Sequence, residues 1–111
     1  MRRQRARLAR RLAAGVVGYL IGSIPSADVA TRLAPGEGTD LRREGSGNPG
    51  GVNAGQVLGK KWGLAVILAD VAKGAAAGFA GRRIGGDTGA YTAATASIAG
   101  HIYPPWSGFQ G

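Results

Sequence analysis

Residues 62–81 read WGLAVILADVAKGAAAGFAG, and this stretch decides the fold. Only Asp70 and Lys73 interrupt its apolar and small residues, and Arg82 and Arg83 follow directly after it. A soluble amphipathic helix would carry more polar positions along one face. A helix that crosses the bilayer core needs about 20 mostly apolar residues, and the run has this length. The stretch therefore predicts a transmembrane helix.

The two charges inside this run lie three residues apart, so Asp70 and Lys73 fall on one face of the predicted helix. Charged side chains within a span face the bundle interior and serve as structural or functional partners. Because mutual neutralisation lowers the cost of burying them, we favour a structural ion pair over direct catalysis.

A second apolar run precedes the first. Residues 12–27, LAAGVVGYLIGSIPSA, carry no charge, and we predict a span over 12–33 with Asp28 near one end. Pro25 would kink this helix, which membrane helices tolerate. A cleaved signal peptide also begins with basic residues and an apolar stretch, but the amphipathic continuation favours a retained helix.

A third run without charges follows the central one, and we predict a span over 88–106. Its small residues permit close helix packing. Tyr103 and Trp106 suit a membrane interface, and Pro104 and Pro105 would end the helix. The three runs together predict an all-α membrane protein with about three transmembrane helices of a larger helical bundle.

Composition limits the chemistry that this chain can carry. The 111 residues include 21 glycines, one histidine and no cysteine. The chain therefore has no disulfide framework and no thiolate nucleophile, and we predict neither a metal site nor a cofactor. The mean hydropathy of −0.02 averages the three apolar runs with a basic tail and a polar loop.

The net charge of +8 is concentrated at the N-terminus, where residues 1–11 read MRRQRARLARR. We interpret this segment as a basic tail that precedes the membrane domain. Such an arm is compatible with a nucleic-acid contact, attraction to anionic lipid, or a solvated tail without a specific role. The tail alone does not discriminate among these.

The loop over 36–61 contains GSGNPGGVN at residues 45–53, which includes the spacing GxGxxG. A dinucleotide-binding turn would follow a buried strand, but the preceding GTDLRRE is too charged for one. A Walker A loop would need Lys and Ser or Thr where Gly51 and Val52 stand. Two interpretations remain open, a solvated turn and an anion nest of backbone N–H groups.

In the nest interpretation, side chains of Ser46, Asn48 and Asn53 add hydrogen-bond donors. Basic residues on both sides would raise the local anion concentration: Arg42, Arg43, Lys60 and Lys61.

Four separated segments carry a family resemblance: GSIPSAD, DLRREGSGNPGGVNAGQVLGKKWG, LADVAKG and GHIYPPWSGFQG. In this order they resemble the N-terminal half of the bacterial PlsY family, from about residue 17 to 111. The resemblance implies an integral-membrane enzyme that transfers an acyl group from acyl phosphate to glycerol 3-phosphate in phospholipid synthesis. It also implies membrane lipid as a partner, no nucleic acid, no metal, and a multi-pass position in the bacterial inner membrane.

The resemblance carries over to particular residues of the loop over 36–61. It implies catalytic roles for Ser46 and Asn53, and phosphate contacts from Gly45, Gly47, Asn48, Gly50, Lys60 and Lys61. Two positions depart from the family pattern, because Gln56 stands where an arginine is common and Val52 where a threonine is usual. A neutral amide does not replace a guanidinium as a charge partner for phosphate.

The C-terminal segment resembles the family's glycine-rich motif for the acyl-phosphate donor, with Gly100, His101 and Gly111 at matching positions. The motif's further glycine and lysine would follow Gly111, so we expect a truncated sequence of about half the enzyme, inactive alone. For His101 a structural hydrogen bond is favoured over proton transfer.

Charge and family disagree on orientation. The tail with Arg82 and Arg83 holds eight basic residues, against five on the side of the loop over 36–61. The positive-inside rule would place that loop outside, whereas the family has it facing the cytoplasm, and we follow the family. A non-catalytic small membrane protein with a basic lipid- or partner-binding arm is the main alternative. A soluble nucleic-acid-binding protein is disfavoured by the few aromatic residues.

Overall fold

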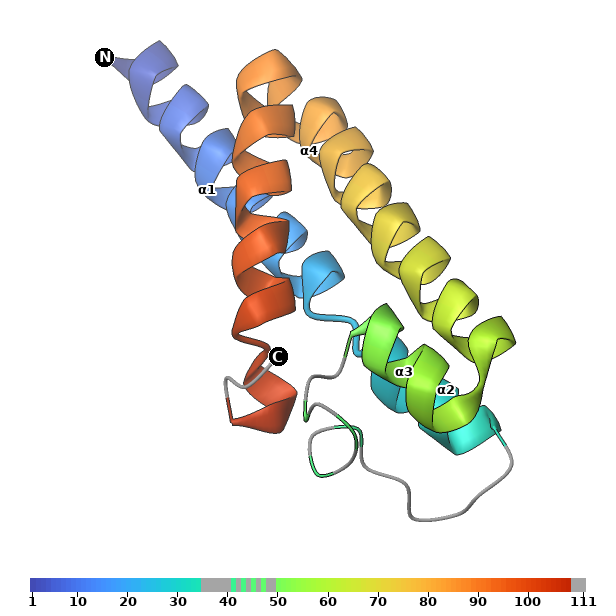
Figure 1. Ribbon diagram of the computed structural model, residues 1–111. Coiled ribbons are helices and arrows are strands. Elements are labelled where there is room, and N and C mark those ends of the chain that lie inside the picture. The colour runs from blue at the N-terminus through green and yellow to red at the C-terminus, as the bar shows by residue number, and fades with distance from the viewer. Residues whose placement is uncertain (35–40, 42, 44, 46, 48–49, 109–111) are drawn as a thin grey trace. The chain divides into compact units, whose positions relative to one another are not determined.

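The computed structural model describes residues 1–34, 41, 43, 45, 47 and 50–108, and most of these residues are helical (Figure 1). The elements are α1 (Arg2–Gly22), α2 (Ser26–Leu33), α3 (Gly51–Leu58), α4 (Lys60–Ile102) and a 3₁₀ helix η1 (Pro105–Ser107). No strand occurs among the described residues. The prediction of an all-α chain is confirmed.

The chain divides into two compact units, which we describe separately. The first unit comprises Met1–Ile24 and Ala72–Gly111, and the second comprises Pro25–Val71.

Small residues allow the helices of the first unit to pack closely. Gly18 of α1 lies against the backbone of Ala93, and Gly22 lies against the backbone of Ser97. Both glycines are buried, so a side chain at either position would overlap the facing helix. Figure 1 shows α1 alongside the C-terminal part of α4. The small residues of the run over 88–106 therefore serve the close packing that the sequence predicted.

The long helix α4 bends at two glycines. Gly85 and Gly86 have non-helical backbone angles, and Gly86 has a φ of +66° that favours glycine. The bend divides α4 into two arms, which correspond to the two spans predicted over 62–81 and 88–106. The first arm extends past Arg82 and Arg83, because arginine is a good helix former and both side chains are exposed at its end.

The span predicted over 12–33 is interrupted. α1 ends at Gly22, and α2 begins again at Ser26, directly after Pro25. Proline lacks an N–H group and its ring hinders the preceding turn, which explains a break rather than a mild kink.

The N-terminal segment also differs from the expectation of a separate tail. Residues 2–11 are helical and continuous with the apolar part of α1. Arginine and alanine both favour helix, so the segment extends the span as one rod.

The second unit has a small apolar core between α2, α3 and the start of α4. Its buried members are Ala27, Ala30, Leu41, Ala54 and Val66, with Val57, Leu58 and Trp62 packed against them. Gly63 of α4 lies against Gly51 and Gly55 of α3, so these two helices pack backbone to backbone. This core holds α3 inside the segment that the sequence predicted as a loop.

Two described segments are long and apolar enough to cross a membrane, Arg2–Leu33 with 32 residues and Lys60–Ile102 with 43. Many large apolar side chains on them are exposed, including Leu12, Leu64, Leu68, Val71 and Ile98. Such a surface suits contact with lipid or with further helices.

Candidate functional site

Two glycines shape the described part of the loop before α3. Gly45 has a φ of +58° and Gly47 a φ of +77°, both in the left-handed region that other residues rarely adopt. Glycine is the residue that adopts this region without steric cost, so the two positions suit a tight turn before α3. Ser46 and Asn48 lie outside the described residues.

The buried side chain of Asn53 ties this loop to α3. Only 1% of Asn53 is exposed, and its Nδ2 donates a hydrogen bond of 2.9 Å to the carbonyl oxygen of Leu41, which is equally buried. Gly45 packs directly on the side-chain oxygen of Asn53, where a Cβ would overlap it. The structure thus brings Asn53 and Gly45 together, and it places Asn53 as an internal anchor of the loop.

The N-terminus of α3 opens directly from the glycine-rich stretch. Gly50 is the N-cap residue with extended backbone angles, and its carbonyl accepts a 2.9 Å hydrogen bond from the N–H of Ala54. The N–H groups of Gly51 and Val52 precede that bond, in the first turn, where an α-helix offers no carbonyl four residues back. They carry the partial positive charge of the helix terminus, which suits a phosphate.

The predicted lysines lie elsewhere in this unit. Lys60 and Lys61 are exposed at the start of α4, beyond Gly59 and therefore at the C-terminal end of α3. α3 has eight residues, which separates them from its N-terminus by about 12 Å of helix. The structure does not bring the lysines to Gly50. Gln56 and Val52 are both exposed on α3.

The segment that resembles a donor motif begins at the end of α4, in the first unit. Gly100 packs against the backbone of Tyr19 and Ser23 at the end of α1, where a Cβ would overlap both. His101 is exposed in the last turn of α4, and Gly111 lies outside the described residues. Gly100 therefore belongs to the helix contact, while His101 remains accessible.

Side chains of distant residues stabilise the break at the end of α1. Nε1 of Trp106 donates a 2.8 Å hydrogen bond to the carbonyl oxygen of Ser23, and Nζ of Lys73 donates a 2.9 Å bond to that of Ile24. The hydroxyl of Tyr19 donates a 2.5 Å bond to the carbonyl of Tyr103. The sequence had suggested an interfacial role for Trp106, but not this contact. Pro25 was the available signal, since a helix break leaves carbonyl oxygens in need of donors.

Among the residues that the structure describes, no three His, Asp or Glu side chains gather as a group that could hold a metal ion.

Comparison with known proteins agrees with this architecture. The family model for glycerol-3-phosphate acyltransferase matches residues 12–111, which include the whole first apolar run. A glycerol-3-phosphate acyltransferase of Cereibacter sphaeroides is 48% identical over 97 residues, covering 87% of this chain and 45% of the relative. One of Exiguobacterium sibiricum is 41% identical over 96 residues, covering 86% of this chain and 46% of the relative.

A solved structure gives the same result for the fold. The chain is similar to PlsY (YgiH), an integral membrane glycerol 3-phosphate acyltransferase in its glycerol 3-phosphate form. The TM-score is 0.79 with 36% identity, over 91% of this chain and 50% of that one. The chain spans about half the length of the relatives that it matches.

Proposed function

This chain belongs to the glycerol-3-phosphate acyltransferase family, and from that membership we propose that the protein transfers an acyl group from acyl phosphate to glycerol 3-phosphate. The 1-hydroxyl oxygen attacks the acyl carbonyl carbon, and the bond from this carbon to the phosphate oxygen breaks. Phosphate leaves and takes up the hydroxyl proton. The products are 1-acyl-glycerol 3-phosphate and inorganic phosphate, the entry step of phospholipid synthesis.

The observation that carries the proposal is the glycine-rich loop that leads into the N-terminus of α3. α3 begins at Gly51 directly after this loop, and the backbone N–H groups at a helix N-terminus suit phosphate. Gly45 and Gly47 have positive φ angles in the loop before it. Both proposed substrates carry phosphate, and preorganised N–H groups stabilise negative charge without reorganisation.

We assign the side chains of this stretch different roles. Ser46 and Asn48 donate hydrogen bonds to phosphate, beside the backbone of Gly45, Gly47 and Gly50. Asn53 is a positioning residue, because its amide is occupied with the carbonyl of Leu41. Lys60 and Lys61 act from a distance as an attractive charge, since α3 separates them from Gly50.

The acyl-phosphate donor is proposed to use the C-terminal segment, where His101 is accessible and Gly100 sets the helix contact. Its acyl chain stays in lipid against the exposed apolar side chains, while its phosphate meets the polar groups at the membrane surface.

The experiment uses membranes of cells that express the protein from its complete gene. Radiolabelled glycerol 3-phosphate is supplied with acyl phosphate, acyl-CoA or acylated carrier protein, and labelled 1-acyl-glycerol 3-phosphate is separated by thin-layer chromatography. We expect product with acyl phosphate alone. Product with acyl-CoA but none with acyl phosphate would refute the proposed donor, and no product with any donor would favour a non-catalytic membrane protein.

A pair of serine variants tests the site. Ser46→Ala should abolish product formation. Ser97→Ala is the matched control, because the Ser97 hydroxyl donates to Ala94 of its own helix and the change should leave the rate unaltered. An unchanged rate in Ser46→Ala would contradict the role assigned to this serine.

We further propose that the protein lies in the bacterial inner membrane with the loop over 36–61 in the cytoplasm, where glycerol 3-phosphate is found. Single cysteines at Arg43, in the loop before α3, and at Thr88, just after the bend of α4, are both exposed and report the two sides of the membrane in this proposal. In spheroplasts, an impermeant maleimide should label Thr88→Cys and spare Arg43→Cys. The reverse pattern would overturn this orientation.

A further inference from the structure

Arginines from two distant parts of the first unit line a common cavity. It has a volume of about 480 Å³, and its lining residues come from the N-terminal turns of α1 and the bend of α4: Arg7, Arg10, Arg11, Arg83, Ile84, Gly85, Gly86 and Thr88. Small-molecule sites range from about 300 to 1,000 Å³, so the cavity has room for a polar headgroup. We propose that it binds the headgroup of an anionic phospholipid.

The position of the arginines on α1 follows from its packing. Ala14, Gly18 and Gly22 form the buried stripe of this helix, spaced four residues apart. Extending the same stripe toward the N-terminus reaches Arg10, Arg11 and Arg7, because residues three and four apart share a face. The face of α1 that packs on α4 through Ala14, Gly18 and Gly22 therefore carries arginines beside the bend of α4.

The bend of α4 supplies the other wall. Gly85 approaches α1 closely, since a Cβ there would lie 3.7 Å from the Cβ of Arg10. Gly86 adopts a φ of +66°, which reverses the chain before the second arm begins. Thr88 adds a hydroxyl to the lining. The two glycines leave space where larger side chains would close the cavity.

The charge of this region is not balanced by the described protein. The N-terminal eleven residues and the bend together contain eight arginines and one acidic residue, Asp87. Asp87 lies 3.7 Å from Arg82, which does not line the cavity. Arg83 lies over the ring of Phe79, 5.3 Å from its centroid. No described carboxylate pairs with Arg7, Arg10 or Arg11, and every charged side chain of the cavity lining is cationic.

The location selects a lipid over a soluble anion. Arg11 is the last charge before the apolar part of α1, and Arg83 follows the apolar part of the first arm of α4. Both therefore lie at the level where spans leave the hydrocarbon core. Leu12 and Phe79 are 62% and 63% exposed beside them, which places apolar surface next to the cationic cavity. Guanidinium groups bind phosphate with directed hydrogen bonds, and acyl chains would cover the apolar side chains.

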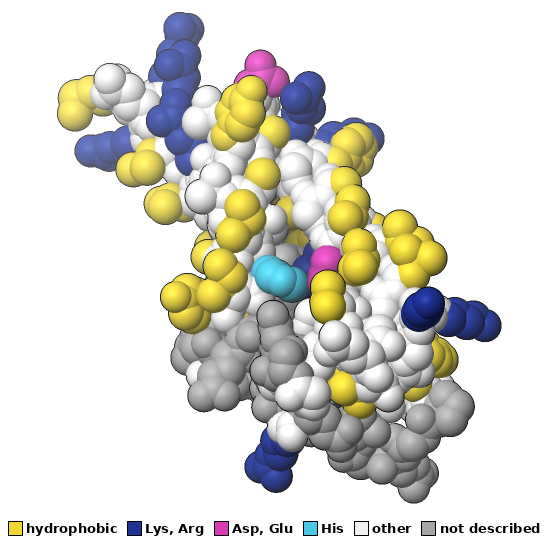
Figure 2. Space-filling model, viewed as in Figure 1, with side chains coloured by type: hydrophobic (Ala, Val, Ile, Leu, Met, Phe, Trp, Pro, Cys, Tyr) yellow, Lys and Arg dark blue, Asp and Glu magenta, His cyan; other side chains and the backbone are white. Residues whose placement is uncertain are grey.

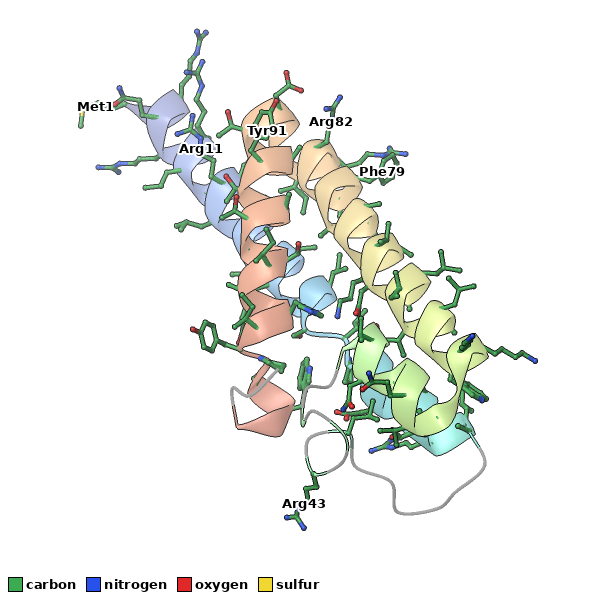
Figure 3. All side chains as sticks on the ribbon, in the orientation of Figure 1. Met1, Arg11, Arg43, Phe79, Arg82 and Tyr91 are labelled. Atoms are coloured by element: carbon green, nitrogen blue, oxygen red, sulfur yellow. The ribbon has the colours of Figure 1, made fainter. Side chains whose placement is uncertain are left out.

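Figures 2 and 3 show this arrangement. Lys and Arg side chains gather over the first turns of α1 and the bend of α4 in Figure 2. In Figure 3, Arg11 lies beside the second arm of α4, while Phe79 and Arg82 mark the end of the first arm.

The test compares two triple variants of the protein expressed from its complete gene and purified in neutral detergent. Arg7, Arg10 and Arg11 are replaced by Gln in the cavity variant, and Arg2, Arg3 and Arg5 in the control variant. Both lose three charges from α1, and all six side chains are exposed, so neither should unfold. Native mass spectrometry measures binding of dioctanoyl phosphatidylglycerol.

We expect one saturable phosphatidylglycerol per wild-type chain and much weaker binding of dioctanoyl phosphatidylcholine. Each basic residue near an anionic lipid contributes roughly fivefold in affinity, so the cavity variant should lose about a hundredfold and the control variant less than tenfold. Equal losses in both variants would refute a defined site and indicate diffuse attraction. Displacement of the lipid by equimolar inorganic phosphate would overturn the assignment to lipid.

The inference does not depend on acyl transfer. If the protein proves inactive with every acyl donor, the lipid stoichiometry and the difference between the two variants still decide it.

Discussion

Replacing Gly18 by alanine should weaken the contact between α1 and the second arm of α4. A Cβ at Gly18 would lie 2.5 Å from the Cα and 2.7 Å from the carbonyl carbon of Ala93, and it would also overlap the Ala93 oxygen. These atoms belong to backbone, so no side chain can rotate away. Ordinary contact begins at 3.4 Å, so the helices would separate by roughly 1 Å.

The magnitude follows from two opposing effects. Alanine stabilises a helix interior by about 0.5–1 kcal/mol relative to glycine. Overpacking a close contact costs about 1–3 kcal/mol, and a gap of 0.5–1 Å already forfeits a quarter to a half of the dispersion energy of the atoms around it. We therefore expect Gly18→Ala to be destabilising by about 1–2 kcal/mol overall.

Gly15 is the matched control on the same helix face. A Cβ there would lie 3.4 Å from the methyl group of Thr92, an ordinary contact with a side chain. Gly15→Ala should therefore keep the helix-propensity gain without the clash. SDS-induced unfolding of the purified protein, followed by far-UV circular dichroism, measures both. The reasoning fails if Gly18→Ala unfolds at the same SDS fraction as Gly15→Ala or at a higher one.

Three further predictions concern the candidate site and its supports. Trp106→Phe removes the donor to the Ser23 carbonyl and should lower the local stability by about 0.5–1.5 kcal/mol. Hydrogen exchange around residues 100–108 should become faster, with Trp62→Phe as the control, and unchanged exchange would count against the bond. Asn53→Ala removes the Nδ2 donor from the buried Leu41 carbonyl, at a cost of about 1–3 kcal/mol in stability. Protease cleavage before α3 should therefore become faster. Gln56→Ala, at an exposed position, should leave the cleavage rate unchanged. Gln56→Arg places a positive charge on α3, and its exposed position tolerates the larger side chain, so the KM for glycerol 3-phosphate should fall by up to about tenfold. An unchanged KM would place Gln56 away from the substrate, and a higher KM would contradict the expected charge partner.

Sequence periodicity predicted the membrane helices because a bilayer imposes a length and a composition that are visible without knowledge of packing. The run over 62–81 and the small residues after residue 88 both appear in α4 as expected. The bend between them lies at Gly85 and Gly86, where the sequence carries two adjacent glycines. The break near Pro25 was predicted as a kink, because the sequence does not reveal that Lys73 and Trp106 would stabilise a full interruption.

The candidate site was harder to predict. The sequence did not predict α3, which lies inside the predicted loop, because its two glycines weaken helix propensity. The same glycines allow close packing on Gly63, and this tertiary contact decides the structure. The buried state of Asn53 likewise depends on Leu41, twelve residues away. Sequence motifs identified residue types that suit phosphate, whereas packing determined which of them are anchors.

The two anion sites that we propose use different groups, and their ligands should differ accordingly. The glycine-rich loop and the N-terminus of α3 offer backbone N–H groups, with the cations of Lys60 and Lys61 at a distance. A dipolar site of this kind suits a substrate that must leave after each turnover, since strong fixed charge would slow release of the product phosphate. The cavity at the bend of α4 offers permanent guanidinium charges instead. Such charges suit a ligand that stays bound, and a membrane lipid, which is always present at high local concentration, meets that condition.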